Sequence, residues 1–453
     1  IVLNDNNMSI SENVGGMSKY LNSVRTADGY LNLRDGVYNT IMDMPNGDKV
    51  ANKIRRFKNM FKQMVVPGML FEDMGITYLG PVDGHDINAM VRTFQEARRI
   101  RKAVIVHVIT EKGRGFTPAE RHPARFHGTE PFDVETGLPL KARTSANYTD
   151  VFSTVMLKLA SRDERVVAIT AAMPDGTGLK RFRNVYPDRF FDVGIAEEHA
   201  VTFAAGLAAG GMRPIVAIYS SFLQRAYDQI LHDVCLQNLP VVFAIDRAGL
   251  VGSDGETHQG IFDIAYLSSM PNMTVLSPMD GEELVEALNY GIAYQDGPIA
   301  VRYPRGRAFL QERKEKNPFE RGRAEVLAQG DQVLFLAVGN MVETALQAAK
   351  MLDRQQIHAT VVNMRFVKPW DETLVAELAP QHKLIVTMED HVYQGGFSQM
   401  VQAFLQRKEI CVPCVHINWP DRFIEHGTVQ QLYERYGMSA EAVAGKVSEE
   451  LQN

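Results

Sequence analysis

The sequence predicts three α/β domains, each with a doubly wound, mainly parallel sheet. The first of these domains is expected to be truncated. Short apolar runs rich in valine and isoleucine alternate with helix-length amphipathic segments along the chain, which is typical of parallel sheets covered by helices. Two polar stretches, 132–150 and 312–323, interrupt this alternation as linkers, and 453 residues suffice for two to four domains. The predicted domains span residues 1–144, 145–322 and 323–453.

The first region contains one clear strand and one clear helix. The run VIVHVIT (104–110) is expected to be a buried strand, and DINAMVRTFQEARRI (86–100) the helix before it. A strand-like run also opens at residue 1, from which we expect sequence to be missing upstream. The basic segment 53–62 carries hydrophobic residues between its lysines and arginines, so we interpret it as the solvated face of an amphipathic helix.

Two further α/β series follow. The second series has strand candidates at 165–170, 190–195, 214–220, 240–246, 273–278 and 299–304. The third has strand candidates at 332–338, 359–366, 383–390 and 412–418. Ligands of doubly wound sheets bind beyond the carboxyl ends of the strands, and polar residues follow several of these runs, including Asp246–Arg247 and Arg305.

Composition excludes several classes of protein. The formal net charge is -6 and no long basic run occurs, so nucleic-acid binding has little electrostatic support. No apolar run approaches the ~20 residues that a membrane span requires, and no signal-peptide pattern is present. Three cysteines are too few for a disulfide framework and indicate a reducing, cytoplasmic compartment. Cys411 and Cys414 lie in a strand-like run, so we interpret their redox-type spacing as coincidental.

Glu197 is the first candidate for chemistry. It follows the strand-like run FFDVGI and opens the small-residue helix EEHAVTFAAGLAAG. An acid at a helix start is already favourable with the helix dipole, by ~0.5 kcal/mol, which is the plain structural interpretation. The functional interpretation is that a carboxylate at the start of a helix of small residues can approach a flat heterocycle closely.

Two more groups of residues stand at strand ends. Tyr219, Phe222 and Arg225 lie in YSSFLQR, where Phe222 either packs in the core or stacks on a ligand ring. Arg247, Asp254 and His258 lie on a glycine-rich loop, and Arg305 follows a later strand. Guanidinium groups bind phosphate oxygens in pairs, so two arginines with a histidine and a tyrosine suit a phosphomonoester. The simpler alternative for His258 is a satisfied core histidine.

Together these segments resemble transketolase-like thiamine-diphosphate enzymes, most closely the 1-deoxy-D-xylulose-5-phosphate synthases. The resemblance spans nearly the whole chain. It rests on IAEEHAVTFAAGLA (195–208), YSSFLQR (219–225), DRAGLVGSDGETHQG (246–260), LNDNNMSIS (3–11), EKGRGFTPAE (111–120), VVPGMLFEDMG (65–75), GPVDGHD (80–86), MRFVKPWDE (364–372) and MEDHVYQGGFSQ (388–399).

The resemblance implies roles for residues in the second region. Glu197 would hydrogen-bond the pyrimidine of thiamine diphosphate, Phe222 would stack on it, and Arg225 would fix the geometry nearby. The acceptor glyceraldehyde 3-phosphate would be bound by Tyr219, Arg247, Asp254, His258 and Arg305. Glu197 and His258 would be catalytic.

The resemblance also implies roles in the first region. Asn6, through its side-chain oxygen, and Met8, through its backbone carbonyl, would hold Mg²⁺, a cation that prefers oxygen ligands. Lys112 and Phe116 would approach the cofactor, and Asn6 would help to bind it. His127 would enter the active site for proton transfer or carboxylate binding. The glycine–aspartate–glycine segment that supplies a further ligand in these enzymes is expected upstream of residue 1. His85 is interpreted as structural.

The implied reaction condenses pyruvate with D-glyceraldehyde 3-phosphate and releases CO2, giving 1-deoxy-D-xylulose 5-phosphate, a precursor of isoprenoids, thiamine and pyridoxal. A homodimer is expected, with the third domain supporting its contacts. The alternative enzymes are a transketolase or the β-type subunit of a 2-oxo-acid dehydrogenase, although the segments LNDN, GPVDGHD and KGRGF count against the latter. A different alternative is an inactive fragment that requires a separate N-terminal polypeptide.

Overall fold

The computed structural model describes residues 1–8, 13–25, 69–129, 131–140, 145–309 and 319–452. The chain divides into two compact units, 1–142 and 143–453, and each is described by itself. Three mostly parallel sheets with helices packed against them confirm the predicted α/β fold class. None of the helices in these ranges combines the length and the apolar character needed to cross a membrane.

The first unit contains a three-stranded parallel sheet in the order β1-β3-β2. Its centre is polar, because buried His107 lies with Nε2 3.0 Å from Asp5 Oδ2 and Nδ1 2.7 Å from the Tyr78 hydroxyl. The elements are β1 (Val2–Asp5), α1 (Gly16–Arg25), α4 (Met69–Asp73), β2 (Thr77–Asp83), α5 (Ile87–Arg99), β3 (Val104–Ile109) and α6 (Thr117–Arg121). The strand predicted at 104–110 and the helix at 86–100 are confirmed, whereas β2 was not predicted.

The second unit is built around a seven-stranded sheet in the order β13-β8-β9-β7-β6-β4-β5. Six strands are parallel and β13 is antiparallel at the edge. The strands are β4 (Val166–Thr170), β5 (Phe190–Asp192), β6 (Arg213–Tyr219), β7 (Val242–Asp246), β8 (Thr274–Leu276), β9 (Ile299–Arg302) and β13 (Phe366–Lys368). Each of the six runs predicted in the second series overlaps one of these strands, although β6 begins one residue before its predicted run.

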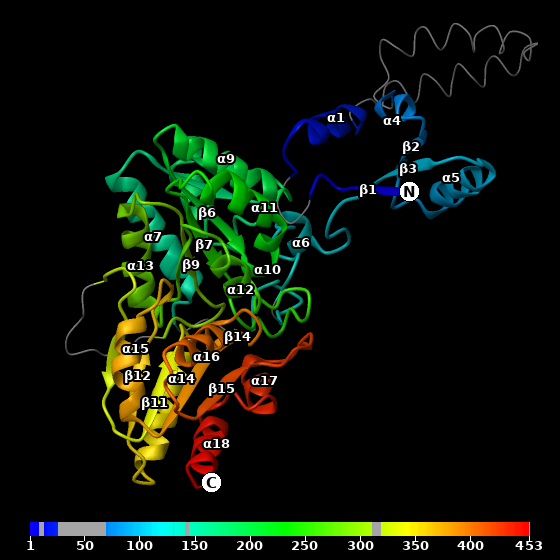
Figure 1. Ribbon diagram of the computed structural model, residues 1–453. Coiled ribbons are helices and arrows are strands. Elements are labelled where there is room, and N and C mark those ends of the chain that lie inside the picture. The colour runs from blue at the N-terminus through cyan, green and yellow to red at the C-terminus, as the bar shows by residue number, and fades with distance from the viewer. Residues whose placement is uncertain (9–12, 26–68, 130, 141–144, 310–318, 453) are drawn as a thin grey trace, which may run out of the picture. The chain divides into compact units, whose positions relative to one another are not determined.

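Both faces of this sheet are covered by helices, as Figure 1 shows. Alternate strand residues such as Val166, Ala168 and Ala217 pack into one core with α7 (Tyr148–Arg162) and α13 (Gly281–Ala293). The helix α9 (Glu197–Ala209) packs against β6. Because both faces are buried, the central strands are apolar throughout and lack the alternation of a half-exposed sheet.

A five-stranded sheet in the order β10-β12-β11-β14-β15 follows, with β10 antiparallel to β12. Its strands are β10 (Glu325–Ala328), β11 (Val333–Ala337), β12 (Ala359–Asn363), β14 (Leu384–Val392) and β15 (Cys414–Trp419). The helices around it are α14 (Met341–Asp353), α15 (Glu372–Leu378), α16 (Phe397–Arg407), α17 (Val429–Arg435) and α18 (Ala440–Gln452). One core joins α14, α17 and α18 to this sheet.

Three details differ from the sequence predictions. The run predicted as one strand at 359–366 is divided, because β12 ends at Asn363 and the chain then joins the larger sheet as β13. The strand β10 was not predicted. Within the expected linker 132–150, α7 already begins at Tyr148, since Asn147 forms a reciprocal capping box with Asp150. The basic segment 53–62 lies outside the described residues.

The cysteine pair supports the interpretation of coincidental spacing. All three cysteines are free, and Cys414 begins the strand β15 instead of a helix. Burial raises the pKa of the Cys414 thiol to about 11, whereas a redox-active cysteine requires a lowered pKa.

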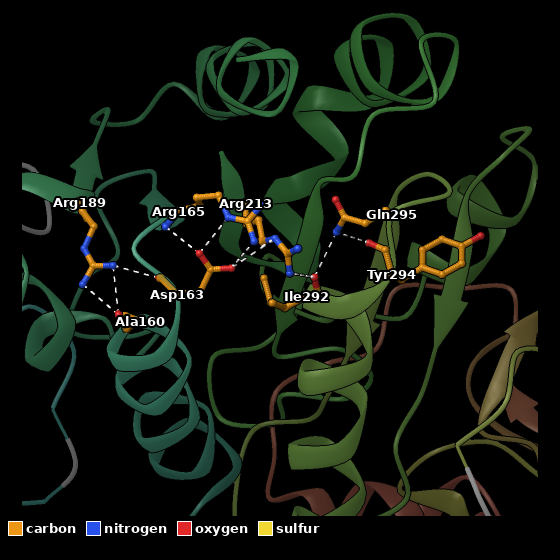
Figure 2. Close-up of polar contacts among 8 residues, drawn as sticks. All are labelled: Ala160, Asp163, Arg165, Arg189, Arg213, Ile292, Tyr294 and Gln295. Atoms are coloured by element: carbon orange, nitrogen blue, oxygen red, sulfur yellow. Dashed lines mark hydrogen bonds and ion pairs between the residues drawn. The ribbon is translucent and has the colours of Figure 1, made fainter. Parts of the chain in front are cut away.

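Arginines satisfy helix carbonyls at the amino-terminal edge of the seven-stranded sheet (Figure 2). Arg189 donates to the carbonyl of Ala160 near the end of α7, and Arg213 NH1 donates to Ile292 O near the end of α13. Cations at helix carboxyl ends also interact favourably with the helix dipole. Asp163 lies between Arg165 and Arg213, with N···O distances of 2.9 and 3.4 Å. This cluster anchors both helices to the sheet.

We expect Asp163→Asn to reduce stability at pH 7 by about 1 kcal/mol or less, because half-exposed ion pairs are screened. Hydrogen bonds from Arg165 lower the pKa of Asp163 to about 2. The contribution is therefore complete above the unfolded pKa near 3.9 and is lost as the pH falls towards 2. Thermal unfolding of both proteins between pH 2 and pH 7 measures this, with Asp188→Asn as an exposed control. A difference that stays constant over that range would contradict the prediction.

Candidate functional site

The candidate residues of the second unit gather at the carboxyl edge of the seven-stranded sheet. Tyr219 is the last residue of β6, Arg247 follows β7, and Arg305 lies three residues after β9. These three strands are neighbours, since β7 pairs in parallel with both β6 and β9. In sheets of this kind ligands bind beyond the carboxyl ends of the strands.

Glu197 begins the helix α9 and is buried, with 2% of its surface exposed. Arg225 NH1 donates to its Oε1 over 2.6 Å. Arg225 belongs to a separate short helical turn, and its side chain is 45% exposed. The carboxylate thus keeps a charged partner that reaches it from the solvent side, which compensates for its burial.

Aromatic rings continue from this ion pair towards the phosphate-binding candidates. Phe222 lies in α10 (Ser220–Leu223), with the Arg225 guanidinium 5.0 Å from its ring centroid. The ring of Tyr219 stacks near Phe222 with centroids 5.7 Å apart, and His258 meets Phe222 edge-on at 5.2 Å. The structure therefore brings Glu197 and the loop residue His258 into one contiguous cluster.

Arg247 is held in a strained conformation behind Tyr219. Its φ of +58° lies in the left-handed region, which costs a non-glycine residue roughly 1–2 kcal/mol. The guanidinium carbon lies 3.7 Å from the Tyr219 ring centroid, and NH1 donates to Gly176 O over 3.1 Å. Such strain persists where neighbouring contacts determine the geometry, as they do here.

Gly176 is a site residue that the sequence analysis missed. A Cβ at this position would lie 1.7 Å from the Tyr219 hydroxyl oxygen, so only glycine allows this approach. The segment DGTG signalled a turn, but nothing in its pattern indicated contact with a residue 43 positions later.

Asp246, the last residue of β7 and the neighbour of Arg247 in sequence, is fully buried. Its Oδ2 accepts from Thr149 Oγ1 over 3.0 Å, and its Oδ1 lies 3.5 Å from Arg247 NH1 without a hydrogen-bond partner. Burial raises the pKa of Asp246 to about 6, against the opposing charge of Arg247. Burial also raises the pKa of the Tyr219 hydroxyl to about 12, so Tyr219 is neutral near pH 7.

Arg305 and Asp254 form an ion pair at the exposed side of this cluster. Arg305 NH1 donates to Asp254 Oδ2 over 2.8 Å and to Ser253 Oγ over 3.3 Å. His258 lies on the same loop, with Nδ1 2.8 Å from Thr257 Oγ1. Burial lowers the pKa of His258, which favours the neutral ring at pH 7. Two arginines and a neutral histidine thus lie within reach of solvent.

In the first unit, Asn6, Met8 and Lys112 line one cavity of about 500 Å³. The side-chain oxygen of Asn6 accepts from the Met8 amide over 3.0 Å, which folds this segment into a tight turn after β1. His85, interpreted from the sequence as structural, lines the same cavity and accepts from the Glu111 amide.

Lys112 and His127 lie together, with Nζ 3.1 Å from Nδ1. Burial lowers the pKa of Lys112. The pKa of His127 is also lowered, mainly by burial and to a smaller extent by the positive charge of Lys112. Phe116 packs instead with Phe126 and Phe132, at centroid distances of 5.5 and 5.9 Å. Its predicted approach to a cofactor stays a prediction.

Comparison with family models gives three matches along the chain. Residues 1–110 match the model described as 1-deoxy-D-xylulose-5-phosphate synthase. Residues 144–309 match the transketolase pyrimidine binding domain, and residues 322–443 match the transketolase C-terminal domain.

Curated relatives carry the same description. The 1-deoxy-D-xylulose-5-phosphate synthase of Lachnoclostridium phytofermentans is 50% identical over 449 residues, which cover 99% of this chain and 72% of that protein. The 1-deoxy-D-xylulose-5-phosphate synthase 2 of Geobacter sulfurreducens is 49% identical over 452 residues, with the same two shares.

Two solved structures show the same architecture. A chain described as a split gene transketolase, inactive beta4 tetramer, is 32% identical with a TM-score of 0.60, covering 67% of this chain and 97% of its own length. A transketolase mutant from Pichia stipitis has a TM-score of 0.55 at 17% identity, covering 83% of this chain and 66% of its own length. The latter likeness concerns the fold alone.

The buried carboxyl of Asp246 predicts a pH-dependent stability. Its pKa is about 6 when folded and near 3.9 when unfolded, so the folded state binds the extra proton between these values. Stability from this group therefore falls as the pH rises from about 4 to about 6. Asp246→Asn cannot ionise, so we expect its unfolding temperature to rise relative to the wild type across that range.

Thermal unfolding measured at intervals between pH 4 and pH 7 tests this expectation. The exposed Asp228→Asn serves as the control and should show no such trend. A wild-type advantage that is constant, or that grows with pH, would contradict the raised pKa of Asp246.

Proposed function

We propose the reaction of this chain on the premise that it belongs to the 1-deoxy-D-xylulose-5-phosphate synthase family and is a transketolase-type transferase. The reaction is the thiamine-diphosphate-dependent condensation of pyruvate with D-glyceraldehyde 3-phosphate, with release of CO2. Its product is 1-deoxy-D-xylulose 5-phosphate. The observation that carries this proposal is the contiguous cluster from Glu197 through Phe222 to Arg247 at one sheet edge.

The residues present fit the pyrimidine end of thiamine diphosphate. A protonatable ring nitrogen requires a carboxylate in a dry environment, and Glu197 is buried at a helix start. A flat ring requires an aromatic or apolar wall, which Phe222 supplies. Arg225 holds Glu197 Oε1, and the other oxygen of this carboxylate is the one assigned to the ring nitrogen.

When bound, the cofactor supplies the electron sink for the decarboxylation. In this proposal Glu197 holds a proton at the pyrimidine, while Phe222 and Arg225 orient the ring and the carboxylate. His258 is proposed to move a proton at the acceptor carbonyl, which its neutral ring at pH 7 and its contact with Phe222 support.

The acceptor phosphate is assigned to Arg247 and Arg305. Both guanidinium groups lie at the same sheet edge, and Arg305 already binds a carboxylate, Asp254, in the way that it would bind a phosphate oxygen. Tyr219 keeps its proton near pH 7, so its hydroxyl can donate to an anion. Asp254 competes with the phosphate for Arg305 and so favours a doubly charged ligand over a weak anion.

In the first unit, Asn6 and Met8 are proposed to hold Mg²⁺ through a side-chain oxygen and a backbone carbonyl. Both residues line the cavity described above, and oxygen ligands are what Mg²⁺ prefers. The described residues contain no cluster of three or more histidine, cysteine or acidic side chains placed for a metal, so Asn6 and Met8 are the ligands proposed from the described part of the chain. Lys112, Phe116 and His127 are proposed to act on the cofactor and the first substrate.

The proposal also includes a homodimeric state, a cytoplasmic location and a division into three domains, 1–144, 145–322 and 323–453. This division is supported by family models that end at residues 110 and 309 and by the separation of the two sheets of the second unit. The free cysteines accord with a reducing compartment.

A second candidate is a chain that is inactive by itself and requires a separate N-terminal polypeptide. The solved neighbour described as a split gene transketolase is an inactive tetramer, and that description concerns the neighbour. The two candidates differ in one assay, because only the first forms 1-deoxy-D-xylulose 5-phosphate from the purified chain with thiamine diphosphate and Mg²⁺.

Glu197→Gln should lower turnover by about 10²–10⁴-fold, because a group that exchanges a proton is lost. The fold should persist, since a glutamine keeps an oxygen for Arg225. Product formation and thermal unfolding are measured side by side. Glu198→Gln, the exposed neighbour on the same helix, is the matched control and should keep normal turnover. Near-normal kcat in Glu197→Gln would refute the role of Glu197.

Arg305→Ala should raise KM for glyceraldehyde 3-phosphate by roughly ten- to a hundredfold, because charge-assisted hydrogen bonds contribute about 1.5–3 kcal/mol. KM for pyruvate should change little. Steady-state kinetics with each substrate varied in turn measures the difference. Arg307→Ala removes a neighbouring arginine that lies 3.6 Å from Glu343, and serves as the control. Equal effects on both substrates would argue against a phosphate role.

A further inference from the structure

The loop that carries Arg247, Asp254 and His258 rests on residues from the far end of the chain. The loop is closed two residues after Arg247, because Gly249 and Gly260 exchange backbone hydrogen bonds of 2.7 and 2.8 Å. The residues at 248–252 and 259–260 are buried, whereas those at 253–254 and 256–257 are exposed, so contacts at the buried ends hold the loop. Those supporting residues belong to β14 and to the segment 419–433.

Asp390 is the centre of this support. It lies in β14 and is 1% exposed. Its Oδ1 accepts from the Leu250 amide over 3.0 Å and from Trp419 Nε1 over 2.7 Å. Its Oδ2 accepts from Asn340 Nδ2 over 2.8 Å and from the Tyr433 hydroxyl over 3.0 Å. Four donors therefore fix both carboxylate oxygens, and one of the donors is the backbone of the loop.

Gly249 shows how closely the loop approaches this carboxylate. A Cβ at Gly249 would lie 2.2 Å from Asp390 Oδ2, and the residue has a φ of +88°. Any other side chain would push the loop away from Asp390 and strain its backbone.

A second contact holds the outer part of the loop. The side-chain oxygen of buried Gln259 accepts from the Val251 amide over 2.8 Å, and its Nε2 lies 3.4 Å from Ile424 O. A Cβ at Gly252 would lie 2.8 Å from Gly427 O. The loop thus contacts Asp390, Ile424 and Gly427, which all belong to the C-terminal series of elements.

We propose that Asp390 is a positioning residue for the phosphorylated acceptor, because it holds the Leu250 amide and thereby the loop that presents Arg247, Asp254 and His258. This inference rests on the proposed function of those residues. It gives the C-terminal series of elements a part in acceptor binding in addition to its structural role. Asp390 touches neither substrate nor cofactor in this proposal.

The donors around Asp390 allow a graded set of variants. Leu250 N–H and Trp419 Nε1–H can only donate, whereas the Tyr433 hydroxyl and the Asn340 amide can each reverse to accept. Asp390→Asn can therefore keep its oxygen towards Leu250 and turn its NH₂ group towards Tyr433. Asp390→Ala loses all four contacts. Arg302, which donates to Asp390 O, stays paired with Asp263 in either variant.

The experiment compares Asp390→Ala, Asp390→Asn and Gly249→Ala in the full chain with thiamine diphosphate and Mg²⁺. We expect Asp390→Ala and Gly249→Ala to raise KM for glyceraldehyde 3-phosphate by roughly ten- to a hundredfold, because small misplacements of binding groups cost that much. KM for pyruvate should be unchanged, and Asp390→Asn should restore KM for the acceptor to near the wild-type value. Amide hydrogen exchange in 249–260 should rise in Asp390→Ala and Gly249→Ala but not in Asp390→Asn.

Tyr433→Phe is the matched control. It removes one donor to Asp390 Oδ2 and keeps the ring beside Trp419, so it weakens the same buried network without releasing Leu250. We expect lower thermal stability with an unchanged KM for the acceptor. An equal rise in KM in this control would show that general destabilisation causes the effect and would overturn the positioning role.

Arg305→Ala, measured in parallel, separates failure of this inference from failure of the proposed function. If Arg305→Ala raises KM for the acceptor and Gly249→Ala does not, the positioning role is wrong and the proposed function stands. If Arg305→Ala also leaves that KM unchanged, the acceptor site is wrong and the inference is overturned with it. Gly249→Ala keeps the test decisive even if Asp390→Ala does not fold.

Discussion

The parallel pairing of β6, β7 and β9 is the constraint on which the candidate site of the second unit depends. Tyr219 lies opposite Asp246 in the register of β6 and β7, and Ile245 lies opposite Arg302 in that of β7 and β9. Residues that follow these strands therefore emerge at one edge, although they are far apart in sequence. A shift of one residue in this register would turn each side chain to the opposite face of the sheet.

Buried carboxylates organise the space beyond that edge, and each has its own means of compensation. Glu197 is paired with an arginine, Asp246 has Thr149 and the nearby Arg247, and Asp390 accepts from four donors. Buried charge is costly unless it is paired and hydrogen-bonded. Asp246 Oδ1 has no hydrogen-bond partner, burial raises the pKa of this carboxyl, and the next residue is Arg247, which is proposed to bind the acceptor phosphate. An incompletely hydrogen-bonded buried carboxyl therefore lies next to the residue that is proposed to bind an anionic substrate.

Sequence periodicity predicted the strands well because parallel strands buried on both faces are apolar throughout. It was less successful where the chain changes sheets. The run 359–366 was predicted as one strand, yet Asn363 ends one strand and Phe366 begins another that pairs with β8. No local pattern distinguishes this from a single strand, because both halves are buried. Gly176 was missed for a similar reason, since its partner Tyr219 is brought near only by the fold.

The sequence by itself determined the fold class, the family and the residue types at the candidate site, because strand patterns and the motifs around Glu197 and Arg247 are local in the chain. Only the tertiary structure decided which of these residues touch. The bond between Arg225 and Glu197 spans 28 positions, and the bond between Asp390 and Leu250 spans 140. Such contacts depend on the stacking of helices and on the pairing of strands, which are set by burial across the whole unit and leave no local periodic signal.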